Sequence, residues 1–299
     1  MYSVLRTAAD LRRCSSWYRP IQSHLAATFL GGRFEQYIVW IARYPSLNGR
    51  RFGAGRRIRL GSGYARCRGG GSEAGATKIL VADSHGNGES LLIDEFPRDV
   101  HIIRSWPRHG GMMAGIDSTF NAAIFIGYHA SASSSAGVRA HTISSATFTR
   151  IAINGQDVSE GELAAAQAGA VGVPVVFMSG DNVATAELRA RIGNIVTVET
   201  KKALSFHSAE TITPAESVAR IEAGVRSALS HVHDFEPYVV TTPVTVEMSY
   251  KNYAAAEIFS YLPGMERVGS RTVKFVGKNI TDAVDVIMVA ESYQPDVSP

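Results

Sequence analysis

Short apolar runs that end in polar, glycine-rich loops recur from residue 78 onward, and this pattern limits the possible folds more than any other feature. The run 78–82 ends at Asp83, and the run 122–128 ends at His129. Runs of this length are typical of buried strands. Where such strands alternate with helices, they form a sheet between helical layers. The sequence therefore predicts an α/β fold with a layered, mainly parallel sheet flanked by helices.

Further strands and two helices are expected where boundary signals are clear. The additional strands are expected at 100–103, 147–153, 174–178, 240–248 and 271–276. Ser159 is a suitable N-cap for a helix that runs to Ala170, with Glu162 in its first turn. A second helix begins at Thr213, followed by a proline and then a glutamate at the positions that favour a helix start.

Charge is distributed unevenly along the chain. Residues 1–72 contain 13 of the 30 Lys and Arg residues, all of them arginine, and two of the 27 acidic residues, Asp10 and Glu35, so their net charge is +11. The remaining 227 residues hold 17 basic and 25 acidic side chains and carry −8. We therefore divide the chain into an atypical arginine-rich segment, 1–72, and an α/β domain, 73–299.

Three interpretations of the arginine-rich segment are open. It could bind nucleic acid, although its arginines are scattered and no known motif frames them. Its shortage of acidic residues also suits an organellar transit peptide. The third interpretation is that the segment is not an evolved protein sequence throughout. No uninterrupted run of about 18 apolar residues occurs anywhere, so we expect no membrane span.

Several polar side chains occupy positions where an α/β fold places its chemistry. His85, His129 and Asp181 directly follow apolar strands, and His141 follows a glycine-containing loop. Together with Glu162 they supply the imidazole and carboxylate groups that zinc prefers. The spacing matches no compact zinc motif, so the residues alone leave open a metal site, ordinary loop histidines and a helix-capping aspartate.

A series of motifs occurs in the order of one family. The motifs are Ala82-Asp83-Ser84-His85, Phe125-Ile126-Gly127-Tyr128-His129-Ala130, Gly137-Val138-Arg139-Ala140-His141-Thr142, Asn154-Gly155, Gly161-Glu162-Leu163, Gly180-Asp181, Thr200-Lys201-Lys202-Ala203-Leu204, Thr213-Pro214-Ala215-Glu216 and Leu262-Pro263-Gly264. In combination they resemble the bacterial zinc-dependent D-aminopeptidases encoded with dipeptide-transport genes, over about residues 73–290.

The resemblance implies an enzyme that hydrolyses N-terminal D-amino acids from short peptides, with two zinc ions per subunit. It implies metal ligands at His85, His129 and Glu162. It also implies that His141 carries the catalytic step, either as a nucleophile or by transferring a proton. A homo-oligomer, specifically a ring-shaped decamer, is implied as well. We expect a cytoplasmic protein that binds short peptides and neither nucleic acid nor membranes.

The chain departs from the family pattern near its beginning. The family opens with a strand that leads into Ala-Asp-x-Glu-Gly, where the aspartate bridges two metal ions and the glutamate binds one. Residues 3–9 match that strand and Asp10 matches the bridging aspartate, but Arg12 and Arg13 stand where Glu-Gly is expected. An arginine there would repel a metal dication. The alternative function is therefore a catalytically inactive family member with an incomplete metal site.

A change of reading frame would explain this departure and the arginine excess together. Codons can be chosen for residues 11–17 such that removing one base after Leu11 yields Glu-Gly followed by small apolar residues. A second shift before Glu73 would restore the frame. We hypothesise that about residues 12–72 are an out-of-frame reading that replaces the first strand and helix of the fold.

Overall fold

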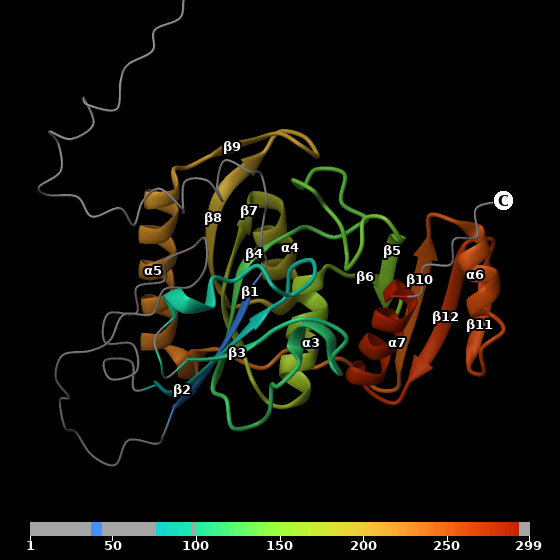
Figure 1. Cartoon of the computed structure of the whole chain (residues 1–299), viewed down its shortest axis with the longest axis horizontal. Helices are drawn as coiled ribbons and strands as arrows, with labels where there is room; N and C mark the ends of the chain where they lie inside the picture. The colour runs from blue at the N-terminus through green and yellow to red at the C-terminus, as the bar shows by residue number, and fades with distance from the viewer. Residues whose placement is uncertain (1–36, 44–75, 97, 99, 293–299) are drawn as a thin grey trace, which may run out of the picture. The chain divides into compact units, whose positions relative to one another are not determined.

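The computed structural model describes residues 37–43, 76–96, 98 and 100–292, all within the unit Phe34–Pro299 (Figure 1). Two sheets organise these residues. The first has seven strands in the order β3-β2-β1-β4-β7-β8-β9. Their bounds are β1 Tyr37–Arg43, β2 Ala76–Asp83, β3 Val100–Ile103, β4 Ala122–Tyr128, β7 Val175–Asp181, β8 Val196–Ala203 and β9 Ala209–Thr211.

The first sheet is mixed. The pairs β2–β3, β4–β7 and β7–β8 are parallel, whereas β9 is antiparallel to β8 and β1 is antiparallel to both of its neighbours. The predicted α/β class is confirmed, with a larger antiparallel share than expected. Strand β1 belongs to the arginine-rich segment and occupies the position between β2 and β4. The strand expected at 3–9 lies outside the described residues.

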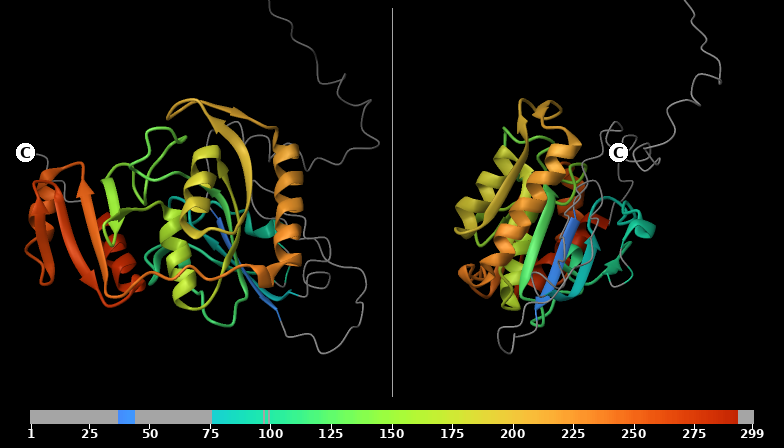
Figure 2. Two further views of the ribbon diagram at one scale, coloured as in Figure 1. Left: turned by 180° about the vertical axis from the view of Figure 1, so that it is seen from behind. Right: turned by 90° about the vertical axis from the view of Figure 1, so that its left-hand side faces the viewer.

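Helices cover both faces of this sheet (Figure 2). On one face lies α5 (Pro214–Ser230), whose Ile221 packs in one core cluster with Ile124 of β4. On the other lie α3 (Glu160–Ala170) and α4 (Asn182–Ile192), whose Leu188 packs with Phe125 of β4. Successive residues of β4 thus point to opposite faces, as strand geometry requires. Both faces of β4 are buried, which fixes the strand that ends at the site described below.

The second sheet is antiparallel and has five strands in the order β11-β12-β10-β5-β6. Their bounds are β5 Phe148–Ile153, β6 Gln156–Asp157, β10 Val244–Tyr250, β11 Met265–Gly269 and β12 Thr272–Gly277. Helices α6 (Tyr253–Phe259) and α7 (Ile280–Ser292) pack against it, and α3 adds Leu163 and Ala166 to the same core. Helix α3 therefore contributes to the cores of both sheets.

The two predicted helices are confirmed, together with their start signals. Ser159 and Glu162 form a reciprocal capping box at α3, and Thr213 caps α5 with its side chain. Structure also appears at every predicted strand from residue 78 onward, whereas α4, α6, α7, β1, β6, β8, β9 and β11 were not predicted. Short 3-10 turns occur at Ile93–Glu95, Gly111–Met113 and Val232–Asp234. Within the described part of the chain, no helix has the length and hydropathy needed to cross a membrane.

Candidate functional site

His129 lies immediately after the last residue of β4 and is 3% exposed. Its Nδ1 is 3.1 Å from the carbonyl oxygen of Val138. Because a carbonyl only accepts hydrogen bonds, Nδ1 carries the proton and Nε2 keeps its lone pair in the neutral ring. Burial lowers the pKa of His129 to about 3, and the nearby positive groups His141, Lys201 and His85 add to this effect. His129 is thus held as a neutral imidazole, the form that binds metal ions.

His141 lies on the loop that follows β4 and approaches His129. The centroids of the two rings are 4.9 Å apart. Nδ1 of His141 is 2.7 Å from the carbonyl oxygen of Arg139, which again leaves Nε2 as the free nitrogen of the neutral ring. The loop holds two non-glycine residues in left-handed backbone conformations, with φ of 48° at Arg139 and 64° at Ile143. Such conformations persist where the surrounding contacts impose them, and they concentrate at functional sites.

Glu160, the first residue of α3, brings a carboxylate to this pair of histidines. Its Oε1 lies 3.4 Å from Nε2 of His141, and the side chain is 3% exposed. The same oxygen accepts a 2.7 Å hydrogen bond from the N–H of Ile143. The first turn of a helix also favours a negative charge, because its free N–H groups point toward it. No sequence motif marks Glu160 as a site residue, although it lies only two residues before Glu162.

Glu162 is engaged elsewhere. One of its oxygens accepts a 2.6 Å hydrogen bond from the N–H of Ser159, and the other pairs with Nε of Arg191 at 2.8 Å. Residues two apart on a helix do not share a face, so Glu160 and Glu162 point in different directions. The structure therefore places Glu160, and not Glu162, beside His141. The predicted ligand Glu162 instead closes a capping box and an ion pair.

The other predicted ligands lie at or beyond the edge of this cluster. His85 is half-buried in the loop after β2, near enough for its charge to lower the pKa of His129. Asp10 lies outside the described residues. In the loop that begins at His85, the N–H of Leu91 donates to Asp83 at 2.7 Å. Burial raises the pKa of Asp83 despite this hydrogen bond.

Asp181 holds the histidine loop in place. Its Oδ1 accepts hydrogen bonds from the N–H groups of Val183 and Ala184 at the start of α4. Its Oδ2 accepts a 3.2 Å hydrogen bond from the N–H of Val138. The helix-capping interpretation of Asp181 is therefore confirmed. The same carboxylate also fixes Val138, the residue whose carbonyl orients His129.

Lys201 is a second residue near the site to which sequence analysis gave no role. It lies on β8 in register with Asp181. Burial lowers the pKa of Lys201 to about 8, and the charge of Asp181 opposes part of that shift. The signal available in the sequence was its place in the Thr200-Lys201-Lys202 motif, which says nothing about where the side chain points.

The donors at this site fit zinc in chemical type. Neutral imidazoles oriented by a backbone carbonyl, with a buried carboxylate nearby, are the ligands and supports that zinc uses in proteins. The number of ligands is too small for a complete site. Among the residues that the structure describes, no three His, Cys, Asp or Glu side chains form a group able to hold a metal ion. A full site therefore needs a further ligand or a rearrangement of those present.

Comparisons with known proteins agree on one family. The Peptidase M55 model, described as D-aminopeptidase, matches residues 48–289. A curated D-aminopeptidase of Bacillus subtilis (strain 168) is 30% identical over 217 residues, which are 72% of this chain and 78% of the relative. A solved structure, described as the Zn-dependent D-aminopeptidase DppA from Bacillus subtilis, a self-compartmentalizing protease, matches with a TM-score of 0.70 and 29% identity, covering 74% of this chain and 81% of that one.

Proposed function

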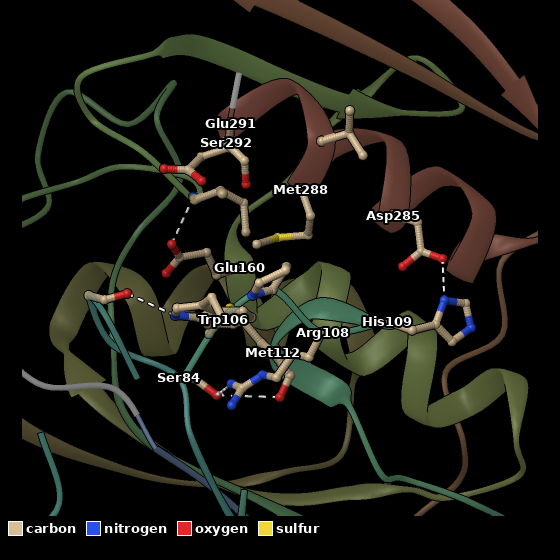
Figure 3. A pocket seen from close by; sticks show the side chains of 14 residues that line it. Ser84, Trp106, Arg108, His109, Met112, Glu160, Asp285, Met288, Glu291 and Ser292 are labelled. Carbon is tan, nitrogen blue, oxygen red and sulfur yellow. Dashed lines mark hydrogen bonds and ion pairs between the residues drawn. The ribbon is translucent and has the colours of Figure 1, made fainter. Parts of the chain in front are cut away.

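Because the chain belongs to the D-aminopeptidase family, we propose that it is a metallo-aminopeptidase that removes N-terminal D-amino acids from short peptides. The observation that carries this proposal is the meeting of His129, His141 and Glu160 at the end of β4. A cavity of about 780 Å³ that Glu160 lines offers room for a small peptide beside them (Figure 3).

We propose that zinc is the metal, with two ions per subunit as the family resemblance implies. His85 and His129 would hold it with a carboxylate of α3, which is Glu162 by the family resemblance, whereas the geometry favours Glu160. Asp10 stays a predicted bridging ligand. When bound, zinc polarises a peptide carbonyl and supplies hydroxide at neutral pH. The Zn-dependence of the structural neighbour supports this choice.

His141 is suited to moving a proton. Its Nδ1 is committed to the carbonyl of Arg139, so in the neutral ring Nε2 accepts the proton. Glu160, 3.4 Å from Nε2, stabilises the imidazolium that results. The ring can then donate that proton to the leaving amine. Nucleophilic attack by Nε2 is the second role that the resemblance implies, and it uses the same lone pair.

One experiment tests this function against the inactive alternative. That alternative is supported by the incomplete donor group among the described residues and by Arg12 and Arg13 after Asp10. We would measure zinc per chain on purified protein, and release of D-alanine from D-alanyl-D-alanine with L-alanyl-L-alanine as the control. The proposal expects two zinc ions and cleavage of the D-peptide only. One zinc or none, with no cleavage, would establish the inactive form.

We further propose a homo-oligomer, specifically a decamer, that works in the cytoplasm and binds no nucleic acid. The self-compartmentalizing description of the structural neighbour supports the oligomer. Sedimentation velocity should give the mass of about ten 32.1 kDa chains. Binding of nucleic acid with an affinity that falls steeply with salt would contradict the proposal that the protein binds no nucleic acid.

We also propose that about residues 12–72 are an out-of-frame reading of the gene. Its support is the arginine-only basic content of 1–72, together with Arg12 and Arg13 at the place of Glu-Gly. Sequencing the gene around codons 10–15 on fresh template tests it. The proposal expects one extra base after the codon of Leu11, whereas an unchanged reading would end it.

A further inference from the structure

The cavity beside Glu160 has a largely apolar wall (Figure 3). The loops after β2, β3 and β4, the 3-10 turn Gly111–Met113 and helix α7 contribute to it. Its apolar side chains are those of Trp106, Pro107, Met112, Ile143, Met288 and Val289. Cavities of this size with apolar walls and a few polar groups are typical binding sites for small molecules. The wall therefore favours apolar contact, and its charged groups indicate which charge the ligand carries.

Arg108 is a cation of this wall, but it has no N–H open to a ligand. Its Nε donates to the carbonyl of Gly111 at 3.0 Å, and its Nη2 donates to the carbonyl of Asp83 at 2.7 Å and to Oγ of Ser84 at 3.3 Å. Its Nη1 is buried. The negative charge of Asp83 also acts on the guanidinium. The positive charge of Arg108 is thus offset within the protein, and the cavity has no anion site at this residue.

Glu291, near the end of α7, is a carboxylate of the wall that lacks a cation. It is half-buried, and burial raises its pKa. No cationic side chain of the described residues forms an ion pair with it. The other acidic residue that α7 gives to the wall, Asp285, already pairs with His109 at 2.6 Å and accepts the N–H of Gly110 at 2.8 Å. Because a nearby cation favours the ionised form of a carboxylate, Glu291 is suited to receive a cationic group of the ligand.

The substrate of the proposed reaction carries such a group close to the scissile bond. A single carbon atom, the α-carbon of the N-terminal residue, separates the ammonium group from the scissile carbonyl. The side chain of that residue starts from the same α-carbon. A peptide cleaved beside Glu160 therefore places both groups in the cavity that Glu160 and Glu291 line. A methyl group would cover little of the apolar wall there, whereas a larger apolar side chain removes more of it from water.

We propose that this cavity binds the N-terminal residue of the substrate, with its ammonium group beside Glu291, and that the enzyme prefers a large apolar side chain at this residue. The inference rests on the proposed peptidase function and names the substrate class of the same site. One methylene group in a hydrophobic pocket changes discrimination by about 10–200-fold. We therefore expect a preference of at least about tenfold for phenylalanine over alanine.

A binding measurement tests the cavity without any need for catalysis. Calorimetric titration compares three small probes that contain no scissile bond. The probe 2-phenylethylamine carries both the ring and the ammonium group, ethylamine lacks the ring, and 2-phenylethanol replaces the ammonium group with a hydroxyl. Wild-type protein should bind 2-phenylethylamine at least about tenfold more tightly than either of the others. Equal affinity for the two amines, or for 2-phenylethylamine and 2-phenylethanol, would overturn the proposal.

Two pairs of variants locate the binding of these probes. Val289 lines the cavity and is 59% exposed, so Val289→Trp narrows the cavity without disturbing the core and should weaken binding of 2-phenylethylamine at least about tenfold. Val276→Trp adds the same bulk at an exposed position of β12 and should leave binding unchanged. Glu291→Gln should abolish the preference for 2-phenylethylamine over 2-phenylethanol, and Glu210→Gln, at an exposed position of β9, should retain it. Equal effects within either pair would contradict the assigned site.

Kinetics then identify the residue of the peptide that the cavity selects. Wild type should cleave D-phenylalanyl-D-alanine with a kcat/KM at least about tenfold above that for D-alanyl-D-alanine, and D-alanyl-D-phenylalanine should show no such gain. Val289→Trp should lower kcat/KM for D-phenylalanyl-D-alanine at least about tenfold more than for D-alanyl-D-alanine, whereas damage to the fold would lower both equally. A preference at the second residue alone would overturn the proposal. If wild type cleaves none of these peptides, the peptidase function fails, and the titration still decides whether the cavity binds an apolar ammonium group.

Discussion

Helix α3 lines two cavities, and its two glutamates meet different partners in them. The smaller one, of about 250 Å³, contains Glu162 and Arg191. There the carboxylate meets a backbone N–H and a guanidinium, and Nη2 of Arg191 donates to the carbonyl of Asp157 at 2.9 Å. In the larger cavity, Oε1 of Glu160 accepts the N–H of Ile143 at 2.7 Å and lies 3.4 Å from Nε2 of His141.

This difference separates two uses of buried charge within one turn of helix. A carboxylate whose oxygens are both committed at short distance holds the fold, because releasing it would leave buried charges unpaired. A carboxylate that lines the larger cavity beside a histidine is placed to act on a ligand. The comparison predicts that Glu160 matters mainly for activity and Glu162 mainly for stability.

The largest expected effect is that of Glu160→Gln on catalysis. Glutamine keeps the shape and can still accept the N–H of Ile143, but it removes the charge that stabilises a protonated His141. We expect kcat/KM on D-alanyl-D-alanine to fall by about 10²–10⁴-fold, the range that general acid–base groups contribute. The free energy of unfolding in urea should change by less than about 1 kcal/mol. Activity close to wild type would remove Glu160 from the site.

Glu162→Gln should lower stability more than activity, the reverse of what we expect for Glu160→Gln. One oxygen can still accept the N–H of Ser159, but the ion pair with Arg191 is lost, and the side chain of Glu162 is only 6% exposed. We expect the free energy of unfolding to fall by about 1–3 kcal/mol, with kcat/KM reduced only slightly. Urea unfolding at matched protein concentration and the same peptide assay measure both. A loss of activity equal to that of Glu160→Gln would break the comparison between the two cavities.

The distinction between these glutamates shows where sequence reasoning stops. The family resemblance is confirmed, and the helix was predicted correctly, with Ser159 as its N-cap and Glu162 in its first turn. The direction of each glutamate was not accessible, because residues 160–169 are buried on every side and α3 has no polar face to orient it. Two glutamates separated by Gly161 then look equivalent in sequence, although the helix turns them to different cavities.

The segment after β3 and strand β1 escaped prediction for a related reason. The segment after β3 is irregular and is held by contacts distant in sequence, such as the one between Gly110 and Asp285 of α7. Strand β1 lies in a segment whose composition suggested no fold, yet it pairs antiparallel with β2 and β4. In both cases the position depends on partners elsewhere in the chain, and local pattern carries no information about them.

The smallest expected effect comes from Ser159→Ala, which weakens the turn that carries both glutamates. Oγ of Ser159 accepts the N–H of Glu162, and losing an N-cap costs about 1 kcal/mol of stability. Thr213→Ala removes the matching cap of α5, on the other face of the sheet, and should cost a similar amount. Only Ser159→Ala should also lower kcat, by a few-fold, because a frayed first turn moves Glu160 away from His141. If both variants lose stability equally and neither loses activity, Glu160 is positioned by Ile143 and the loop rather than by its helix.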